Sequence, residues 1–231
     1  MEAKAMAANI KRLLVTICAA ALIALTVSCA GLDKPIKNSS AANINAEKRI
    51  LSVLEEMSKD RKYATWNITK EEGRLLRILT AAAGAKNIVE IGTSNGYSTI
   101  WFCLALRTTG GRITTHEIDP YRIEIADKNF KKAGIRHLVT IVAGDAHENV
   151  TRLKEPIDIL YIDADKAGYF DYFKKLLPLV RPGGLILAHN TIDLASEMQD
   201  YLKAVTNNPE LETIILLKQP SGLSVTLKKR R

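Results

Sequence analysis

The stretch NIVEIGTSNGYS, residues 87–98, decides the fold of this chain. It begins as an apolar run that ends at Gly92, passes through small polar residues to Gly96, and leads into an apolar helix pattern. A buried strand, a glycine turn and a helix start are therefore predicted, and such a turn brings backbone N–H groups close to a ligand. The spacing E-x-G-x-x-x-G, which begins at Glu90, lacks the middle glycine of the dinucleotide fingerprint. It favours a cationic or amine-bearing ligand over a phosphate and disfavours a nicotinamide-dependent oxidoreductase.

Beyond this stretch, predicted strands and helices alternate along the chain. The predicted strands are Ile88–Ile91, Arg112–Glu117, Val139–Val142, Ile157–Ile162 and Leu185–Ala188. The helices between them are predicted to begin near Gly96, Pro120, Ala146 and Gly168. This order is typical of an α/β fold in which helices cover both faces of a parallel sheet.

The two ends of the predicted domain depart from this alternation. Two helices precede the first strand, at about Ile44–Asp60 and Thr69–Ala83. Thr69 and Glu72 form a capping-box pattern at the start of the second. The chain closes with a helix and two strands, at about Asp193–Asn207, Thr213–Leu217 and Leu223–Leu227. The short link through Pro220 and Gly222 predicts an antiparallel hairpin at one edge of the sheet.

The composition is that of a globular protein of one domain. The chain has 231 residues, of which 47% are hydrophobic and 25% charged, so it can bury a sizeable core. Part of the net charge of +8 lies at the two chain ends, where a solvated surface is the first interpretation and an anionic membrane surface the second. No nucleic-acid recognition motif is present, and no nucleic-acid partner is expected. Three cysteines, Cys18, Cys29 and Cys103, give no disulfide framework.

The first 30 residues are predicted to be a signal peptide or a membrane anchor. Leu13–Ala30 carries no charge and follows basic residues, which is the pattern of a secretory signal. Its end resembles a bacterial lipobox, which would make Cys29 the lipidated first residue of the mature protein. Alternatively the segment stays uncleaved, although it is short for a bilayer span. Residues 31–43 read as a linker, and residues 44–231 as the folded domain; protease accessibility in intact cells would establish on which side of the membrane that domain lies.

Polar residues follow several of the predicted strands. Glu117 ends the second strand, where an acid can accept hydrogen bonds from a ribose diol. Asp163 follows one later strand, and His189 and Asn190 follow the next. If these strand ends are neighbours, the three side chains can bind Mg²⁺, Ca²⁺ or Mn²⁺, and the imidazole shifts the preference toward Mn²⁺ or Zn²⁺. The alternative is a helix cap at Asp163 and a hydrogen-bonded turn at His189-Asn190.

Five motifs in order, VEIGTSNGYS, THEIDP, AGDA, YIDADKAGYFDYF and LVRPGGLILAHN, resemble a known family. It is the cation-dependent class I O-methyltransferases of the catechol and caffeoyl-CoA type, and the resemblance covers about Thr69 to Leu227. It implies a Rossmann-like sheet of seven strands, mostly parallel, with an antiparallel last strand. It also implies S-adenosylmethionine as cofactor, a small hydroxylated acceptor such as a catechol, and a possible homodimer.

The resemblance assigns roles to matching residues. The methionine part of the cofactor would be lined by Glu90, Gly92 and Ser98. The ribose would be held by Glu117, and the adenine flanked by Asp145 and Ala146. A divalent cation would be bound by Asp163, His189 and Asn190, with Asp163 also beside the cofactor. Lys166 would be the base that helps to deprotonate the acceptor hydroxyl.

Two departures from the family pattern modify these expectations. The family has Asp-Asn where this chain has His189-Asn190, so Mg²⁺ affinity should fall, and either a softer ion or no metal is used. The family also has a longer segment after the asparagine, whereas here Thr191–Leu194 is predicted to pass directly into a helix, which predicts a more open acceptor pocket. The rival interpretation is a membrane-tethered binding module without catalysis, favoured by the histidine and by the export signal.

Overall fold

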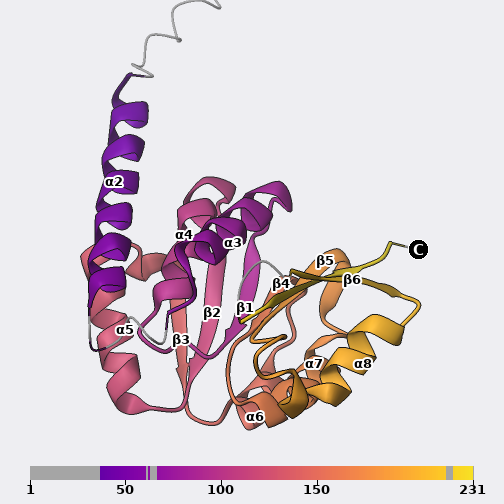
Figure 1. The fold of residues 1–231 in the computed structure, drawn as a ribbon. Helices are drawn as coiled ribbons and strands as arrows, with labels where there is room; N and C mark the ends of the chain where they lie inside the picture. Colours follow the sequence, from indigo (N-terminus) through magenta and orange to yellow (C-terminus); the bar gives the residue numbers. More distant parts are fainter. Residues whose placement is uncertain (1–36, 61, 63–66, 217–220, 231) are drawn as a thin grey trace, which may run out of the picture. The chain divides into compact units, whose positions relative to one another are not determined.

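A computed structural model describes residues 37–60, 62, 67–216 and 221–230 of the chain (Figure 1). The chain divides into two units, Met1–Ile44 and Asn45–Arg231, and the second holds the sheet. The predicted signal peptide or anchor, with Cys29, lies outside the described residues and stays a prediction. None of the helices in the described part is both long enough and apolar enough to cross a membrane.

The described elements follow the predicted α/β order. The strands are β1 (Asn87–Ile91), β2 (Arg112–Glu117), β3 (Val139–Ala143), β4 (Ile157–Ile162), β5 (Val180–His189), β6 (Leu211–Leu216) and β7 (Leu223–Lys228). The α-helices are α2 (Lys37–Lys59), α3 (Lys70–Ala82), α4 (Tyr97–Thr109), α5 (Pro120–Ala133), α6 (Ala146–Asn149), α7 (Tyr169–Leu176) and α8 (Gln199–Asn207). Short 3₁₀ helices lie between them at η2 (Arg136–Leu138), η3 (Val150–Arg152), η4 (Lys166–Gly168) and η5 (Ala195–Glu197).

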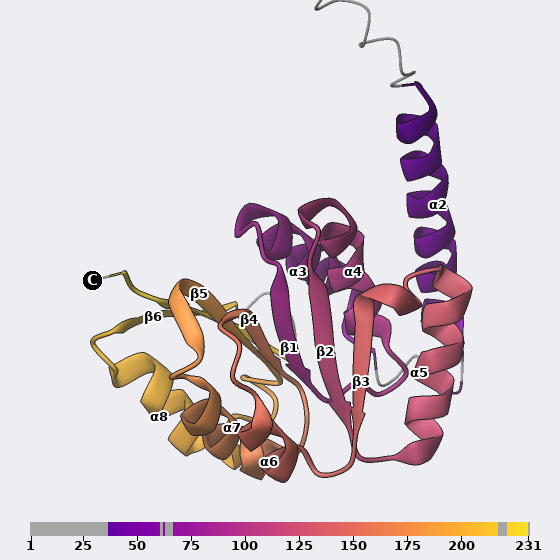
Figure 2. The same cartoon turned by 180° about the vertical axis from the view of Figure 1, so that it is seen from behind.

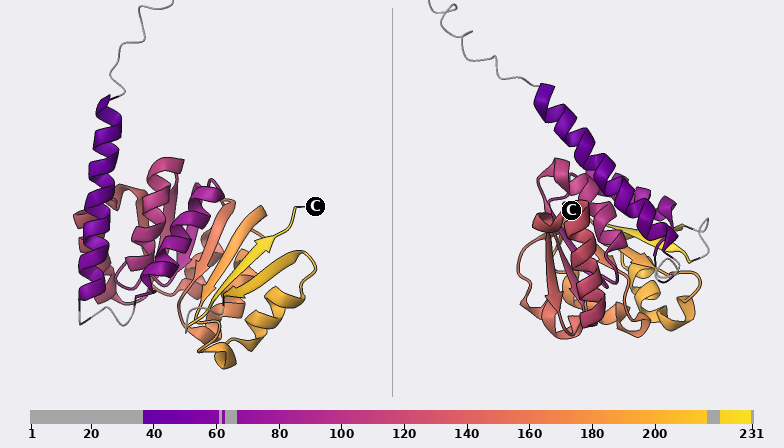
Figure 3. Two further views of the ribbon diagram at one scale, coloured as in Figure 1. Left: turned by 45° about the horizontal axis from the view of Figure 1, so that its top comes forward. Right: turned by 90° about the vertical axis from the view of Figure 1, so that its left-hand side faces the viewer.

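The seven strands form one sheet in the order β3-β2-β1-β4-β5-β7-β6. Strands β1 to β5 pair in parallel, whereas β7 is antiparallel to both of its neighbours, β5 and β6. Figure 3 shows β6 and β7 side by side at one edge of the sheet, which is formed by the last two strands of the chain. The predicted Rossmann-like fold with an antiparallel last strand is therefore confirmed.

Helices cover both faces of the sheet (Figures 1 and 2). One apolar core joins α2, α3, α4 and α5 to one face, and the other joins α7 and α8 to the opposite face. Successive strand residues alternate between the two cores, because side chains of a strand point to opposite faces. In β1, for example, Ile88 belongs to the first core and Val89 to the second. Burial on both faces explains why apolar residues predominate in β1 and β4.

Local sequence signals place the ends of several helices. The predicted capping box is present at α3, where Glu72 N–H donates to the Thr69 hydroxyl and Thr69 N–H donates to the Glu72 carboxylate. Pro120 occupies the first turn of α5, and Asp119 caps it. These caps fix where each helix begins relative to the strand before it.

Two helix boundaries were predicted wrongly. Helix α2 begins at Lys37 and not at Ile44, so residues 37–43 of the predicted linker are helical. Helix α8 begins at Gln199 and not near Asp193. Before it, Ile192 N–H donates to the Ser221 carbonyl, and this long-range bond holds the segment after Asn190 in turns.

Candidate functional site

A cavity of about 580 Å³ lies at the carboxyl ends of the parallel strands. Its wall includes Gly92 after β1, Glu117 at the end of β2, Asp145 after β3 and Asp163 after β4. Ligands of open α/β sheets bind at this edge, and the volume is within the range of small-molecule sites. The cavity is therefore the candidate binding site.

The glycine turn after β1 forms the floor of this cavity. Gly92 has a φ of +98°, and a Cβ built on it would lie 2.1 Å from the carbonyl oxygen of Asp163. Gly96, with a φ of +87°, caps the N-terminus of α4, and a Cβ there would meet the Phe130 ring at 2.4 Å. Only glycine combines these backbone angles with such close packing. The predicted order of strand, glycine turn and helix start is present, and the turn also brings β1 close to the end of β4.

Glu117 presents a fixed carboxylate to the cavity. Its Oε2 accepts a hydrogen bond from Ser94 N–H at 2.7 Å, and its Oε1 accepts from Ile118 N–H and Asp119 N–H, each at 3.0 Å. A carboxylate has about four acceptor positions, so this one retains capacity for a ligand hydroxyl. Because three backbone donors hold it, the acceptor is oriented before any ligand arrives.

Glu90 lies behind the cavity wall. It is fully buried, and it reaches the cavity through its hydrogen-bond partners. Its carboxylate accepts hydrogen bonds from the hydroxyls of Ser98 (2.6 Å), Thr99 (2.5 Å) and Thr115 (2.6 Å). Ser98 itself lines the cavity, so Glu90 acts on the site by orienting that hydroxyl.

Burial raises the pKa of Glu90 to about 7, against the hydrogen bonds from Ser98, Thr115 and Thr99, which lower it. Between its ordinary value of 4.5 and about 7, the folded chain keeps a proton that the unfolded chain releases. Glu90 should therefore reduce the free energy of unfolding as the pH rises through this window, by on the order of 3 kcal/mol.

We expect Glu90→Gln to remove this pH-dependent loss of stability, because the amide does not titrate. Chemical denaturation at several pH values from 4.5 to 8 measures it. The free energy of unfolding of the wild type, minus that of the variant, should decrease as the pH rises to about 7 and should then stay constant. The exposed Glu124→Gln is the control and should follow the wild type. Parallel profiles for wild type and Glu90→Gln would contradict the assignment.

The residues predicted to flank an adenine lie in the cavity wall. Asp145 accepts a hydrogen bond from His147 N–H at 2.8 Å and caps α6, and Ala146 follows it in the cavity wall. The His147 ring stacks on Tyr172 at 4.2 Å between centroids. Burial alone would lower the pKa of His147, but the carboxylates of Asp171 and Asp165 raise it above the ordinary value. Both rings line the cavity, so this part of the wall offers flat surfaces beside a carboxylate.

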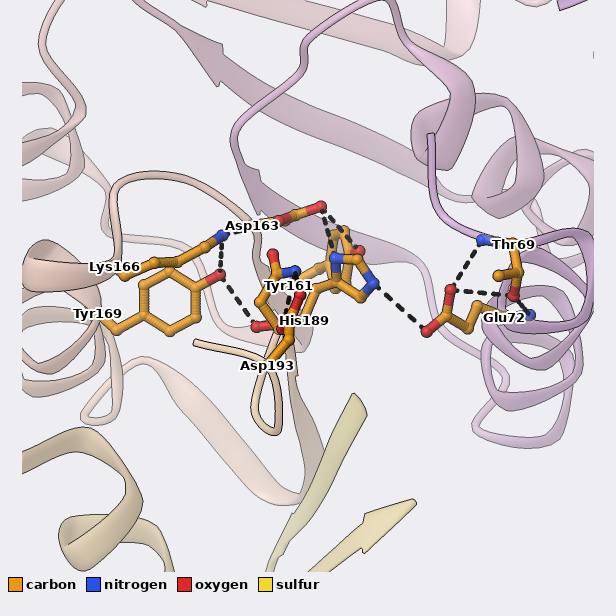
Figure 4. A network of polar contacts seen from close by, with 9 residues as sticks. Thr69, Glu72, Tyr161, Asp163, Lys166, Tyr169, His189 and Asp193 are labelled. Carbon is orange, nitrogen blue, oxygen red and sulfur yellow. Dashed lines mark hydrogen bonds and ion pairs between the residues drawn. The ribbon is translucent and has the colours of Figure 1, made fainter. Parts of the chain in front are cut away.

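A network of charged and polar groups links the start of α3 to the ends of β4 and β5 (Figure 4). His189 Nε2 lies 3.3 Å from Glu72 Oε1, and His189 Nδ1 lies 3.4 Å from Asp163 Oδ2. Lys166 Nζ lies 3.2 Å from Asp163 Oδ1 and 2.9 Å from the Tyr169 hydroxyl, which donates to the His189 carbonyl. Lys166 and Asp163 line the cavity, whereas His189 and Glu72 lie behind them.

The two carboxylates control the charge of His189. Its burial would lower its pKa, but Asp163 and Glu72 outweigh burial and raise the pKa to about 9. In return, His189 holds the pKa of both carboxyl groups below the ordinary value, despite the burial that raises it. At neutral pH the ring is therefore an imidazolium between two carboxylates.

The side chains predicted to bind a metal are engaged by other groups of the chain. His189 lies between the carboxylates of Asp163 and Glu72, and the Asn190 side chain turns to Asp193, with its Nδ2 3.2 Å from both carboxylate oxygens. Asn190 also has a left-handed backbone, with a φ of +59°. Among the described residues, no cluster of three or more His, Cys, Asp or Glu side chains could hold a metal ion. His189 and Asn190 each have an acidic partner nearby. The metal site predicted at Asp163, His189 and Asn190 stays a prediction.

Sequence reasoning missed Glu72 as a site residue. The capping box placed it at the start of α3, but nothing in the sequence indicated that this helix end lies against the end of β5. Glu72 Oε1 has no hydrogen bond within the described structure, which leaves His189 as its charged partner. The buried acid could have been suspected only from the need of a buried histidine for a counter-charge.

Comparison with known proteins agrees with this geometry. A family model described as O-methyltransferase matches residues 38–208. The chain belongs to this O-methyltransferase family. It is also 31% identical to caffeoyl-CoA O-methyltransferase 5 of Nicotiana tabacum over 192 residues, which cover 71% of this chain and 78% of that protein.

Two further relatives of this family member extend the comparison. Catechol O-methyltransferase of Niastella koreensis is 42% identical over 130 residues, 54% of this chain and 58% of that protein, so the chain spans little more than half of this curated relative. The crystal structure of the O-methyltransferase from Bacillus cereus, in complex with SAH, matches with a TM-score of 0.67 and 26% identity, covering 90% of this chain and 97% of that one.

Proposed function

We propose that this chain is an S-adenosylmethionine-dependent O-methyltransferase that acts on a hydroxyl group of a small molecule. The observation that carries the proposal is the Glu117 carboxylate, held by three backbone N–H groups at the edge of the cavity. A fixed carboxylate at the end of the second strand suits the hydroxyls of a nucleoside ribose. Family membership and the SAH-bound relative from Bacillus cereus support the same cofactor.

The residues around the cavity suit the parts of that cofactor. Glu117 would hold the ribose, Asp145 and Ala146 would flank the adenine, and Gly92 and Ser98 would lie along the methionine part. S-adenosylmethionine would supply a sulfonium methyl group, which an oxygen nucleophile accepts. Since the reaction requires an in-line approach, positioning by the cavity wall would supply much of the acceleration.

Lys166 is the charged donor that faces the acceptor. Its ammonium group lies between Asp163 and the Tyr169 hydroxyl, and its side chain lines the cavity. Lys166 Nζ acts as a hydrogen-bond donor to both neighbours. We therefore assign Lys166 to stabilising the acceptor oxyanion, in place of the base role that the resemblance implied.

A methyl-transfer assay with labelled S-adenosylmethionine and a panel of phenols tests the proposal. Wild type should methylate at least one phenol, and Lys166→Met should lower kcat by about 10²-fold or more, because one donor to a developing charge contributes on this scale. Lys174→Met, which removes an exposed lysine outside the cavity wall, is the matched control and should retain activity.

Cofactor binding without methyl transfer to any acceptor would instead favour the rival, a binding module without catalysis. Equal activity of Lys166→Met and wild type would contradict the role of Lys166. Membrane association through residues 1–30 and a homodimer stay predictions.

A further inference from the structure

The two carboxylate oxygens of Asp163 already have partners within this chain. Asp163 Oδ1 meets the Lys166 ammonium at 3.2 Å, and Oδ2 meets His189 Nδ1 and the Tyr161 hydroxyl, each at 3.4 Å. A divalent cation at Asp163 would have to compete with the Lys166 ammonium group and the His189 ring for the two carboxylate oxygens. Asp163 is thus engaged by two cationic side chains and one hydroxyl of this chain.

The placement of the His189 ring fixes what it can donate. Each of its two nitrogens faces a carboxylate oxygen, of Asp163 on one side and of Glu72 on the other. A metal ion at either nitrogen would therefore have to displace a carboxylate of this chain from the ring. The ring is 8% exposed, and Glu72 is held in turn by Thr69 N–H and the Thr69 hydroxyl, so the arrangement is anchored on both sides.

The charges in this cluster balance without an added ion. The carboxylates of Asp163 and Glu72 face the cationic groups of His189 and Lys166. A divalent cation at Asp163 would add positive charge beside a set of four groups that is already balanced, which is unfavourable. By contrast, a metal site needs unpaired carboxylate oxygens or neutral imidazole nitrogens.

We propose that this site transfers a methyl group without a divalent cation, and that the acceptor binds through one hydroxyl at Lys166 with no need for a vicinal diol. The inference rests on the proposed function. A metal ion chelated by two oxygens selects for vicinal diols, whereas a single ammonium group is a point charge that one oxyanion can satisfy. The substrate class is therefore wider than catechols and includes phenols with one hydroxyl.

The reaction balances without a metal. The acceptor hydroxyl releases its proton to bulk water, and the resulting oxyanion is held at the Lys166 ammonium group. Its oxygen lone pair forms the new C–O bond to the methyl carbon while the C–S bond breaks, and that electron pair stays on sulfur. Asp163 and His189 keep Lys166 in place during this step.

Binding of Mn²⁺ alone, followed by electron paramagnetic resonance, tests the first half of the proposal without any enzymatic assay. Wild type should show no saturable site up to about 1 mM Mn²⁺, the weak end of biological cation sites. His189→Asp restores a carboxylate and should gain at least about 10-fold in Mn²⁺ affinity, the scale on which groups around a metal tune it. His189→Asn is the matched control, because it removes the ring without adding a carboxylate. Its gain in Mn²⁺ affinity should be smaller than that of His189→Asp.

One saturable Mn²⁺ site in wild type that Asp163→Asn abolishes would overturn the proposal. This comparison does not depend on the folding of the His189 variants, because it needs only wild type and a variant that keeps the ring. Melting temperatures of all variants are measured alongside.

The second half is tested by acceptor choice in the presence of EDTA. A 3,4-dihydroxyphenyl compound and its 4-hydroxyphenyl counterpart should differ in kcat/KM by less than about 10-fold, the worth of one weak contact. Calorimetric binding of the monohydroxy compound to the SAH complex is the readout that does not require turnover.

Methylation of the diol alone, and only after Mn²⁺ is added, would overturn the inference while leaving the proposed function intact. Absence of S-adenosylmethionine binding would overturn the proposed function itself and the acceptor half of the inference. The Mn²⁺ titration then still decides the metal half.

Discussion

Glu117→Gln is expected to weaken the binding of S-adenosylmethionine by about 10²-fold or more. Two ribose hydroxyls would lose a charged acceptor, and hydrogen bonds to charged groups contribute about 1.5–3 kcal/mol each. In the variant, the NH₂ of the amide would also replace one carboxylate oxygen. It would then face backbone N–H groups that now donate to that oxygen, either that of Ser94 or those of Ile118 and Asp119. Isothermal titration calorimetry measures the change in Kd.

The neighbouring acid provides the control for this substitution. Asp119 lies outside the cavity wall and caps α5, with its Oδ1 accepting from Tyr121 N–H at 2.8 Å. Asp119→Asn should bind the cofactor as the wild type does. Equal affinity of Glu117→Gln and wild type would show that the carboxylate does not hold the ribose.

Gly92→Ala is expected to destabilise the fold by at least about 3 kcal/mol and to abolish cofactor binding, because strained backbone and a steric clash coincide. The new Cβ would lie 2.1 Å from the Asp163 carbonyl oxygen, so β1 and β4 would have to separate at the cavity floor. A φ of +98° is itself unfavourable for alanine. Chemical denaturation gives the free energy of unfolding, and calorimetry the cofactor affinity.

Gly84→Ala separates the clash from the backbone effect. Gly84 also has a positive φ, +57°, but a Cβ there would have no atom within 4 Å. It should cost only about 1–2 kcal/mol, the penalty of a left-handed residue, and leave cofactor binding unchanged. If the two variants were equally stable and both bound the cofactor, the close approach at Gly92 would not shape the site.

Two strand ranges were predicted to the residue, because the alternation of strand and helix patterns and the motifs that follow the strands marked them. The ranges Arg112–Glu117 and Ile157–Ile162 coincide with β2 and β4. Helix ends were harder. The start of α2 has no apolar periodicity to mark it, and the segment before α8 is held by Ser221, a contact across the chain that no local pattern reports.

Some of the candidate site residues could also be predicted from the sequence, and others could not. Gly92, Glu117 and Asp145 lie at or just after strand ends, so the motif and the topology together placed them at the cavity. The hydrogen bonds of Glu90 could not be predicted, since its partners come from β2 as well as from α4. The pairing of His189 with Glu72 depends on how α3 packs against β5, which is set by tertiary structure alone.

A crystal structure of the chain with S-adenosylhomocysteine is the most direct test of the account. We expect both ribose hydroxyls within hydrogen-bond distance of Glu117, the adenine beside Asp145-Ala146 and the amino-acid end along the Gly92 turn. A ligand bound elsewhere, or a cavity that takes a phosphate-bearing nucleotide in its place, would contradict it.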